Sequence, residues 1–310
     1  MLSSTAKNLY WMGRYLQRAE NMARLLEATQ RTALQSSKTE AFDLAEMYGL
    51  ADAFEATHPD GELPQLIDFM TLSAENPSSV INSVRAARDN ARAERNNLTT
   101  DVWESLNGLW LEVSAIARRR RGGIDRGALV ETVKKQTVLI AGAAQSTLLR
   151  DEAWNFMSLG TYLERADNTI RILDVKYHRL QPDGAPEARD GVDYYGWSEI
   201  LTCIGALRTY RRIYRARIEP RRVAELLILR RDLPRSIHHC LWQLDLSMRE
   251  LAELYGNRGE ADRQAGALHA ELRYGRIDDI FEAGLRDFLE DVRDRLDTLS
   301  GEIGRQFLMD

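Results

Sequence analysis

One block of twelve residues occurs twice in this chain. Residues 13–24 and 160–171 share glycine, tyrosine, leucine, arginine, alanine, an acidic residue, asparagine and a final arginine at corresponding positions. The two copies are separated by an offset of 147 residues. Such self-similarity at a fixed offset constrains the fold strongly, because it indicates one structural unit that is built twice.

A second pair of blocks follows in the same order. Residues 67–80 and 224–237 correspond at an offset of 157, and the ten additional residues fit an insertion within 181–191. Two matches in one order predict a tandem duplication, with a first helical repeat over 1–150 and a second over 151–310. We expect the copies to pack as one globular unit about a pseudo-twofold axis, as the subunits of a homodimer do.

The hydrophobic pattern is helical along nearly the whole chain. Helices are expected over 40–56, 78–96, 100–120 and 126–149, with Asn76-Pro77 providing the N-cap and first residue of the second. No alternating strand pattern is present, so the expected fold class is all-α, a helical bundle of two tandem copies. The stripe of the first segment consists of Leu9, Met12, Leu16, Ala19, Ala23 and Leu26.

The composition supports a folded protein of the cytoplasm. Hydrophobic residues make up 44% of the 310 residues and charged ones 29%, which excludes a disordered or low-complexity chain. Cys203 and Cys240 provide neither a disulfide framework nor zinc-ligand spacing, which favours a reducing compartment. No apolar run approaches the ~20 residues that span a bilayer, so neither a membrane segment nor a signal peptide is expected.

Arginine dominates the basic residues. Only five of the 42 lysines and arginines are lysine, although the net charge is −5. This excess fits either a GC-rich genome or a protein that holds anions, since the guanidinium fork matches carboxylates and phosphates.

Both blocks carry an Arg-Ala-acid-Asn-x-x-Arg run in their first helix. The acid and the final arginine stand four residues apart, a spacing that favours an ion pair on one helical face. If the two first helices lie side by side, both runs meet, either as a structural ion-pair network or as a polar pocket for an anionic ligand. The candidate ligand-binding residues are Arg18, Glu20, Asn21, Arg24, Arg165, Asp167, Asn168 and Arg171.

Other motifs give weaker signals. Glu55 and His58 have the Glu-x-x-His spacing of di-iron bundles, but it occurs once, so no metal is expected. His238-His239 falls outside the repeat and is interpreted as structural. The basic run 118–121 is interpreted as a helix C-terminus, and the pI of about 5.7 argues against nucleic-acid binding. No phosphate-binding glycine loop is present, so no cofactor is expected.

Several stretches together resemble a known family. Residues 9–21, the pair Glu164-Arg165, residues 76–79 with 87–92, and residues 233–236 are similar to the alpha-E family, a bacterial helical domain with a Glu-Arg motif. The resemblance extends over nearly the whole chain. It implies partnership with a circularly permuted ATP-grasp ligase and a transglutaminase-like protein, whose products are peptide-like amides.

The resemblance leaves three functions open. The first is an accessory or partner protein of an ATP-grasp-type peptide or amide ligase system, whose Arg/acid/Asn cluster binds an anionic small molecule or peptide. The second is an enzyme that uses Glu164 as acid or base, and the third is a purely structural interaction module. The Glu-Arg motif maps onto Glu164-Arg165, whereas the first copy has Gln17-Arg18 and lacks the glutamate.

Overall fold

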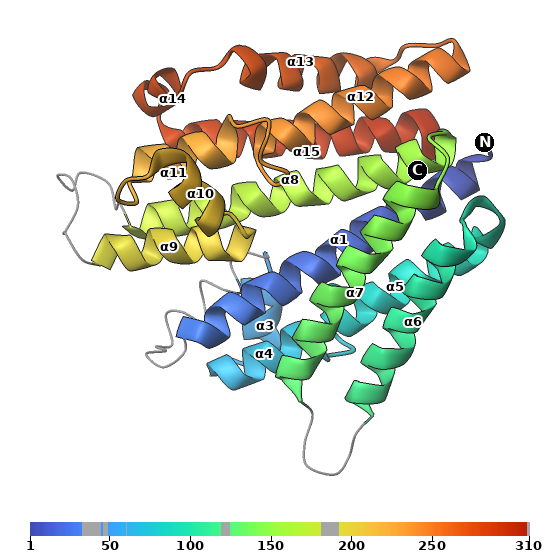
Figure 1. The fold of residues 1–310 in the computed structure, drawn as a ribbon, viewed down its shortest axis with the longest axis horizontal. Coiled ribbons are helices and arrows are strands. Elements are labelled where there is room, and N and C mark those ends of the chain that lie inside the picture. The colour runs from blue at the N-terminus through green and yellow to red at the C-terminus, as the bar shows by residue number, and fades with distance from the viewer. Residues whose placement is uncertain (33–44, 46–48, 60, 119–124, 181–191, 309–310) are drawn as a thin grey trace.

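Every regular element of the described chain is a helix. The computed structural model describes residues 1–32, 45, 49–59, 61–118, 125–180 and 192–308, and these contain no strand (Figure 1). The all-α prediction is therefore confirmed. The helices of the N-terminal half are α1 (Ser3–Thr32), α3 (Ala51–Thr57), α4 (Leu63–Thr71), α5 (Val80–Ala93), the 3-10 turn Arg95–Asn97, α6 (Thr100–Ala117) and α7 (Arg126–Thr147).

The C-terminal half continues in the same manner from a second long helix. Its elements are α8 (Glu152–Leu180), α9 (Val192–Ile204), α10 (Leu207–Tyr214), α11 (Pro220–Ile228), α12 (Ile237–Tyr255), α13 (Glu260–Tyr274), α14 (Ile277–Ala283), α15 (Leu285–Ile303) and a π-helical turn, Gly304–Leu308.

The expected helices over 100–120 and 126–149 are present as α6 and α7, but the start of α5 differs from the prediction. Ser79, not Asn76, is its N-cap, and the Ser79 Oγ accepts the backbone N–H of Asn82. Asn76 instead accepts the N–H of Ser78 and closes a turn that contains Pro77. Asn76 was wrong as the N-cap because its side chain satisfies this turn.

Two other expectations fall where the structure gives little information. Residues 40–44 and 46–48 of the helix expected over 40–56 lie outside the described residues, and α3 begins only at Ala51. The insertion within 181–191 also lies outside them.

Helices α1 and α8 form the centre of the molecule and pack against each other (Figure 1). Their backbones meet at two glycines. A Cβ on Gly13 would lie 2.3 Å from the carbonyl oxygen of Met157, and one on Gly160 would lie 2.0 Å from that of Tyr10. The expectation that the two first helices lie together is confirmed.

The other long helices pack on this central pair from two sides. α5 and α7 pack on α1 and are bridged by α6, whereas α12 and α15 pack on α8 and are bridged by α13 (Figure 1). One continuous apolar core runs through both halves and includes the predicted stripe positions Leu9, Met12 and Leu26.

Two further expectations concerned the cysteines, which were not expected to form a disulfide framework, and the absence of a membrane segment. Cys203 and Cys240 are buried, and burial raises the pKa of the Cys240 thiol to about 12, so this thiol is unreactive at neutral pH. Of the helices in the described ranges, none is both long enough and apolar enough to cross a bilayer.

The glycine contact generates a prediction about stability. Gly13→Ala is expected to destabilise the fold by about 3 kcal/mol, because the new methyl group would force the α1 and α8 backbones apart. The matched control is Gly142→Ala on α7, where an added Cβ meets nothing within 4 Å. The control should be neutral or stabilising by up to about 1 kcal/mol, since alanine favours helix. Urea denaturation measures both, and equal stabilities would refute the close contact.

Candidate functional site

A buried carboxylate joins the two central helices. Glu164 on α8 accepts from Arg14 Nε at 2.9 Å, and from Arg18 through Nε at 2.6 Å and Nη2 at 3.0 Å. Its side chain is only 9% exposed. Burial alone would raise the pKa of Glu164, but Arg18 and Arg14 outweigh burial and lower the pKa below its ordinary value. Glu164 is therefore a carboxylate held by two arginines of the facing helix.

The reciprocal pair lacks the carboxylate. Arg165 on α8 reaches back to α1, where it donates to the amide oxygen of Gln17 through Nε at 3.1 Å and Nη2 at 2.6 Å. Its Nη1 lies 3.4 Å from the carbonyl oxygen of Pro234. Among the described residues, no carboxylate lies within ion-pairing distance of Arg165. A neutral amide thus occupies the place at which Arg18 has a glutamate.

Next to Gln17, a single carboxylate is surrounded by arginines. Glu20 accepts from Arg24 Nε at 2.9 Å and from Arg235 Nη2 at 2.5 Å. Burial opposes its ionisation, but Arg235, Arg24 and Arg165 lower the pKa of Glu20 to about 2. Burial lowers the pKa of Arg235 to about 10, and the nearby Arg165 and Arg24 add to this effect against the opposing charge of Glu20. Two guanidinium groups therefore share one carboxylate, and the charge of a third, that of Arg165, acts on it from nearby.

A pocket of about 200 Å³ opens beside this cluster, between α1, α7 and α8. Gln17, Glu20 and Arg165 give it one polar side, and Arg165 also lies over the ring of Tyr162, 5.2 Å from its centroid. The other walls are largely apolar. The pocket is lined by Gly13, Leu16, Gln17, Glu20, Thr137, Ile140, Ala141, Ala144, Gln145, Trp154, Met157, Ser158, Thr161, Tyr162 and Arg165.

Both ion pairs that the four-residue spacing predicts are present. Arg24 pairs with Glu20 and Arg171 with Asp167, each at 2.9 Å. Asn21 joins the first cluster, where its side-chain oxygen accepts from Gln17 at 2.7 Å. The ion pairs expected on the two helices are therefore confirmed, and Asn21 joins the one on α1.

Of the second predicted run, only Arg165 reaches the pocket. Asp167, Asn168 and Arg171 are absent from its lining, and burial raises the pKa of Asp167 above its ordinary value. Asn168 makes no hydrogen bond to the Glu20 cluster within the described ranges. Of the eight predicted residues, only Glu20 and Arg165 line the pocket. Asp167 pairs with Arg171 and is buried near Glu164 and Arg14.

Two arginines of the site were not predicted from the sequence. Arg14 lies within the first block, but its counterpart in the second block is Thr161, so a search for matching residues passes over it. Arg235 corresponds to Ser78 in the second pair of blocks and was missed for the same reason. The signal that could have found both is a difference between the copies at a position flanked by matches.

The weaker motifs have structural surroundings. His238 and His239 donate through Nδ1 to the carbonyl oxygens of Leu229 and Arg231, each at 2.8 Å, as expected of structural histidines. His58 stacks on the ring of Phe54. Arg118 is the C-cap of α6, in agreement with the expected helix C-terminus, and 119–121 lie outside the described residues.

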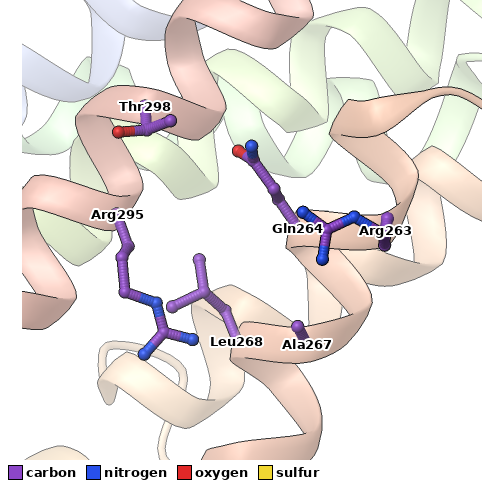
Figure 2. A pocket seen from close by; sticks show the side chains of 6 residues that line it. All are labelled: Arg263, Gln264, Ala267, Leu268, Arg295 and Thr298. Carbon is purple, nitrogen blue, oxygen red and sulfur yellow. The ribbon is translucent and has the colours of Figure 1, made fainter.

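Another hollow, of about 230 Å³, lies between α13 and α15 (Figure 2). Its two arginines already have acidic partners, since Arg263 pairs with Glu260, and Arg295 pairs with Glu271 at 2.7 Å. It therefore offers no uncompensated charge to a ligand. The lining residues labelled in Figure 2 are Arg263, Gln264, Ala267, Leu268, Arg295 and Thr298.

Comparison with known proteins identifies the family. Residues 1–308 match the Alpha-E family, described as a predicted alpha-helical domain with a conserved ER motif, and the chain belongs to this family. It is similar to uncharacterised proteins of Mycobacterium bovis and Mycobacterium tuberculosis, with 24% identity over 313 residues and 92% of this chain covered. The match spans 34% of those relatives, about a third of their length. No solved structure matches the chain.

The doubly paired carboxylate generates a prediction about stability. Glu164→Gln is expected to destabilise the fold by about 3–5 kcal/mol, because Arg14 and Arg18 would remain buried without a counter-charge. The matched control is Glu131→Gln, which breaks the exposed pair with Lys135 on α7 and should leave the stability nearly unchanged. Urea denaturation at neutral pH measures the difference. Similar costs for the two variants would show that Glu164 is not an essential counter-ion.

Proposed function

We propose that this Alpha-E protein is an accessory component of an ATP-grasp-type peptide or amide ligase system, and that its pocket binds an anionic group on Arg165. The group is a carboxylate or a phosphate of a small molecule or peptide. One observation carries the proposal: Arg165 borders a pocket and is bonded to the amide of Gln17, where the equivalent Arg18 is bonded to a carboxylate.

The charge balance around the pocket favours an anion. Arg24, Arg165 and Arg235 carry three positive charges against the one negative charge of Glu20. Partly buried charges of one sign are costly when uncompensated, so an entering anion would relieve their repulsion. Arginine also binds carboxylate and phosphate through two parallel hydrogen bonds, which lysine cannot do.

We also propose that the two halves are copies of one helical unit, over residues 1–150 and 151–310. Support comes from hydrogen bonds at corresponding positions. Ser79 caps α5 and donates to the carbonyl oxygen of Ser73, and Ser236 caps α12 and donates to that of Arg230. The packing of α5, α6 and α7 on α1 likewise corresponds to that of α12, α13 and α15 on α8. In this view, Gln17 and Glu164 are equivalent positions that have diverged.

Binding is favoured over catalysis by the state of Glu164. Its oxygens accept three N–H bonds from arginines, and its pKa is lowered, so it is a poor proton acceptor at neutral pH. A structural role suits this end of the α1–α8 contact. The Arg165 end differs because its arginine is bonded to a neutral amide, whereas Arg18 is bonded to a carboxylate.

The chain spans about a third of the mycobacterial proteins it matches, so in those proteins this helical unit is part of a longer chain. That arrangement favours a function exercised together with other domains or proteins. We propose that the partner is an ATP-grasp ligase, which acts in the cytoplasm with this chain and a transglutaminase-like protein.

Restoring the missing glutamate tests the anion site. Gln17→Glu is expected to abolish anion binding, because the new carboxylate would pair with Arg165 as Glu164 pairs with Arg18. Phosphate, or acetate, replacing chloride at constant ionic strength should raise the melting temperature of the wild type by about 2 °C or more. The variant should show no such rise.

Gln65→Glu is the matched control for that experiment. Gln65 is exposed and closes the capping box of α4, a role that glutamate also fills, so the substitution adds the same charge away from the pocket. The control should respond to phosphate or acetate as the wild type does. If neither anion stabilises the wild type, or if both variants respond equally, the anion site is disproved.

Co-purification tests the ligase partnership. The chain, tagged and co-expressed with the ATP-grasp protein of the same genome, is expected to retain it on an affinity column and to change the products that the ligase forms. Gln17→Glu should alter the products that the ligase forms, because the variant closes the anion site. Absence of both association and any effect on the products would contradict the partnership and leave the anion site standing on its own test.

A further inference from the structure

We propose that the pocket binds the C-terminal residue of a peptide, or an N-acylated amino acid, that carries an apolar side chain. The carboxylate pairs with Arg165, the amide N–H donates to Glu20, and the side chain fills the apolar part of the pocket. This inference rests on the proposed anion site and specifies the ligand that it takes.

The contact to the ligand carboxylate is inferred from the hydrogen-bond donors of Arg165. A guanidinium group has five N–H donors, of which Gln17 takes two and the carbonyl oxygen of Pro234 lies near a third. Two donors, one on each terminal nitrogen, are left for a ligand. Two parallel bonds on that edge are the arrangement in which arginine binds a carboxylate.

The apolar side chain of the ligand is inferred from the size and the lining of the pocket. Its volume is about 200 Å³, and Ile140, Ala144 and Met157 are among its lining residues. An apolar cavity of about 150 Å³ is enough to bind benzene. The pocket therefore has room for one aromatic or branched aliphatic side chain, and its apolar lining favours such a group over a polar one.

The corresponding region of the other half shows what fills such a space. Tyr10 and Arg14 occupy the positions that Met157 and Thr161 have beside the pocket. Tyr10 is 2% exposed, and its hydroxyl bonds to Ser300 at 3.0 Å and accepts from Arg14 at 3.2 Å. Next to α15, a tyrosine ring and an arginine of α1 take up the room. Next to α7, the smaller side chains of Met157 and Thr161 leave it to a ligand.

The contact to the amide N–H of the ligand is inferred from the unequal hydrogen bonding of the two carboxylate oxygens of Glu20. Oε1 accepts from both Arg24 and Arg235, whereas Oε2 accepts only from Gln17, at 3.3 Å, within the described chain. A carboxylate oxygen readily accepts more than one hydrogen bond. Because Glu20 lines the pocket together with Arg165, a ligand with an N–H close to its carboxylate satisfies both groups. An acylated amino acid has this arrangement, and a simple fatty or aryl acid does not.

Isothermal titration calorimetry on the whole chain tests these three contacts with four probes. N-acetyl-L-phenylalanine is expected to bind at least tenfold more tightly than N-acetylglycine, which lacks the side chain. It should also bind at least tenfold more tightly than N-acetyl-L-phenylalanine amide, which lacks the charge. 3-Phenylpropionate lacks the N–H and should bind several-fold more weakly. If any one of the other three probes binds the protein as tightly as N-acetyl-L-phenylalanine does, the inference is overturned.

Two variants locate the binding. Ala144→Ile reduces the pocket volume and should remove the advantage of N-acetyl-L-phenylalanine over N-acetylglycine while leaving the weaker ligand unchanged. Ala141→Leu narrows the same wall from an exposed position, so it gives the same test if the buried substitution impairs folding. Retention of the full advantage in a folded variant would show that the side chain binds elsewhere.

The failure of this inference is distinguishable from that of the proposed function. If N-acetylglycine, acetate or phosphate binds the wild type but not the Gln17→Glu variant, the anion site stands. If the phenyl group then adds no affinity, only the ligand class is wrong. If none of these anions binds, both proposals fail.

Discussion

The rest of this structure depends on a buried charge, the carboxylate of Glu164, at the contact between its two longest helices. Such a charge is tolerated only when it is paired and hydrogen-bonded, and Arg14 and Arg18 supply both conditions from the facing helix. The pairing requires α1 and α8 to approach closely, and Gly13 and Gly160 permit this approach because they have no Cβ. The ion pairs and the glycines thus fix the relative position of the two helices on which both halves pack.

The two sides of the same contact differ in charge and in packing. On the Glu164 side, two arginines and a carboxylate satisfy each other, and Tyr10 and Arg14 fill the adjoining space. On the Gln17 side, the amide oxygen accepts hydrogen bonds from Arg165 but carries no charge, and smaller side chains leave a pocket beside Arg165. Functional sites in folded proteins are often the places where a local pairing rule is broken, and this position fits that pattern.

Much of the fold could be predicted from the sequence, and the site could be predicted only in part. The stripe at Leu9, Met12 and Leu26 predicts a buried helical face because helical periodicity depends on local spacing, and the structure buries all three. The pairs Glu20–Arg24 and Asp167–Arg171 are equally local. The contribution of Arg235 is not, because it depends on a loop that folds back onto α1 from more than two hundred residues away. Asn76 failed as a helix cap for a related reason, since its side chain can satisfy either a turn or a helix.

Under the proposal that the two halves are copies of one unit, the positions that differ inform function more than the positions that match. Matching residues such as Gly13 and Gly160 serve the packing that both halves need, and their identity follows from a steric limit. The positions that differ change the electrostatics without changing that packing, because Gln17 and Glu164 have nearly the same shape. Replacing a carboxylate with an amide removes one negative charge from a partly buried cluster and leaves its arginines in place. Under the proposed function, such a cluster retains its geometry and gains affinity for an anion, which is the simplest physical route from a structural ion pair to a binding site.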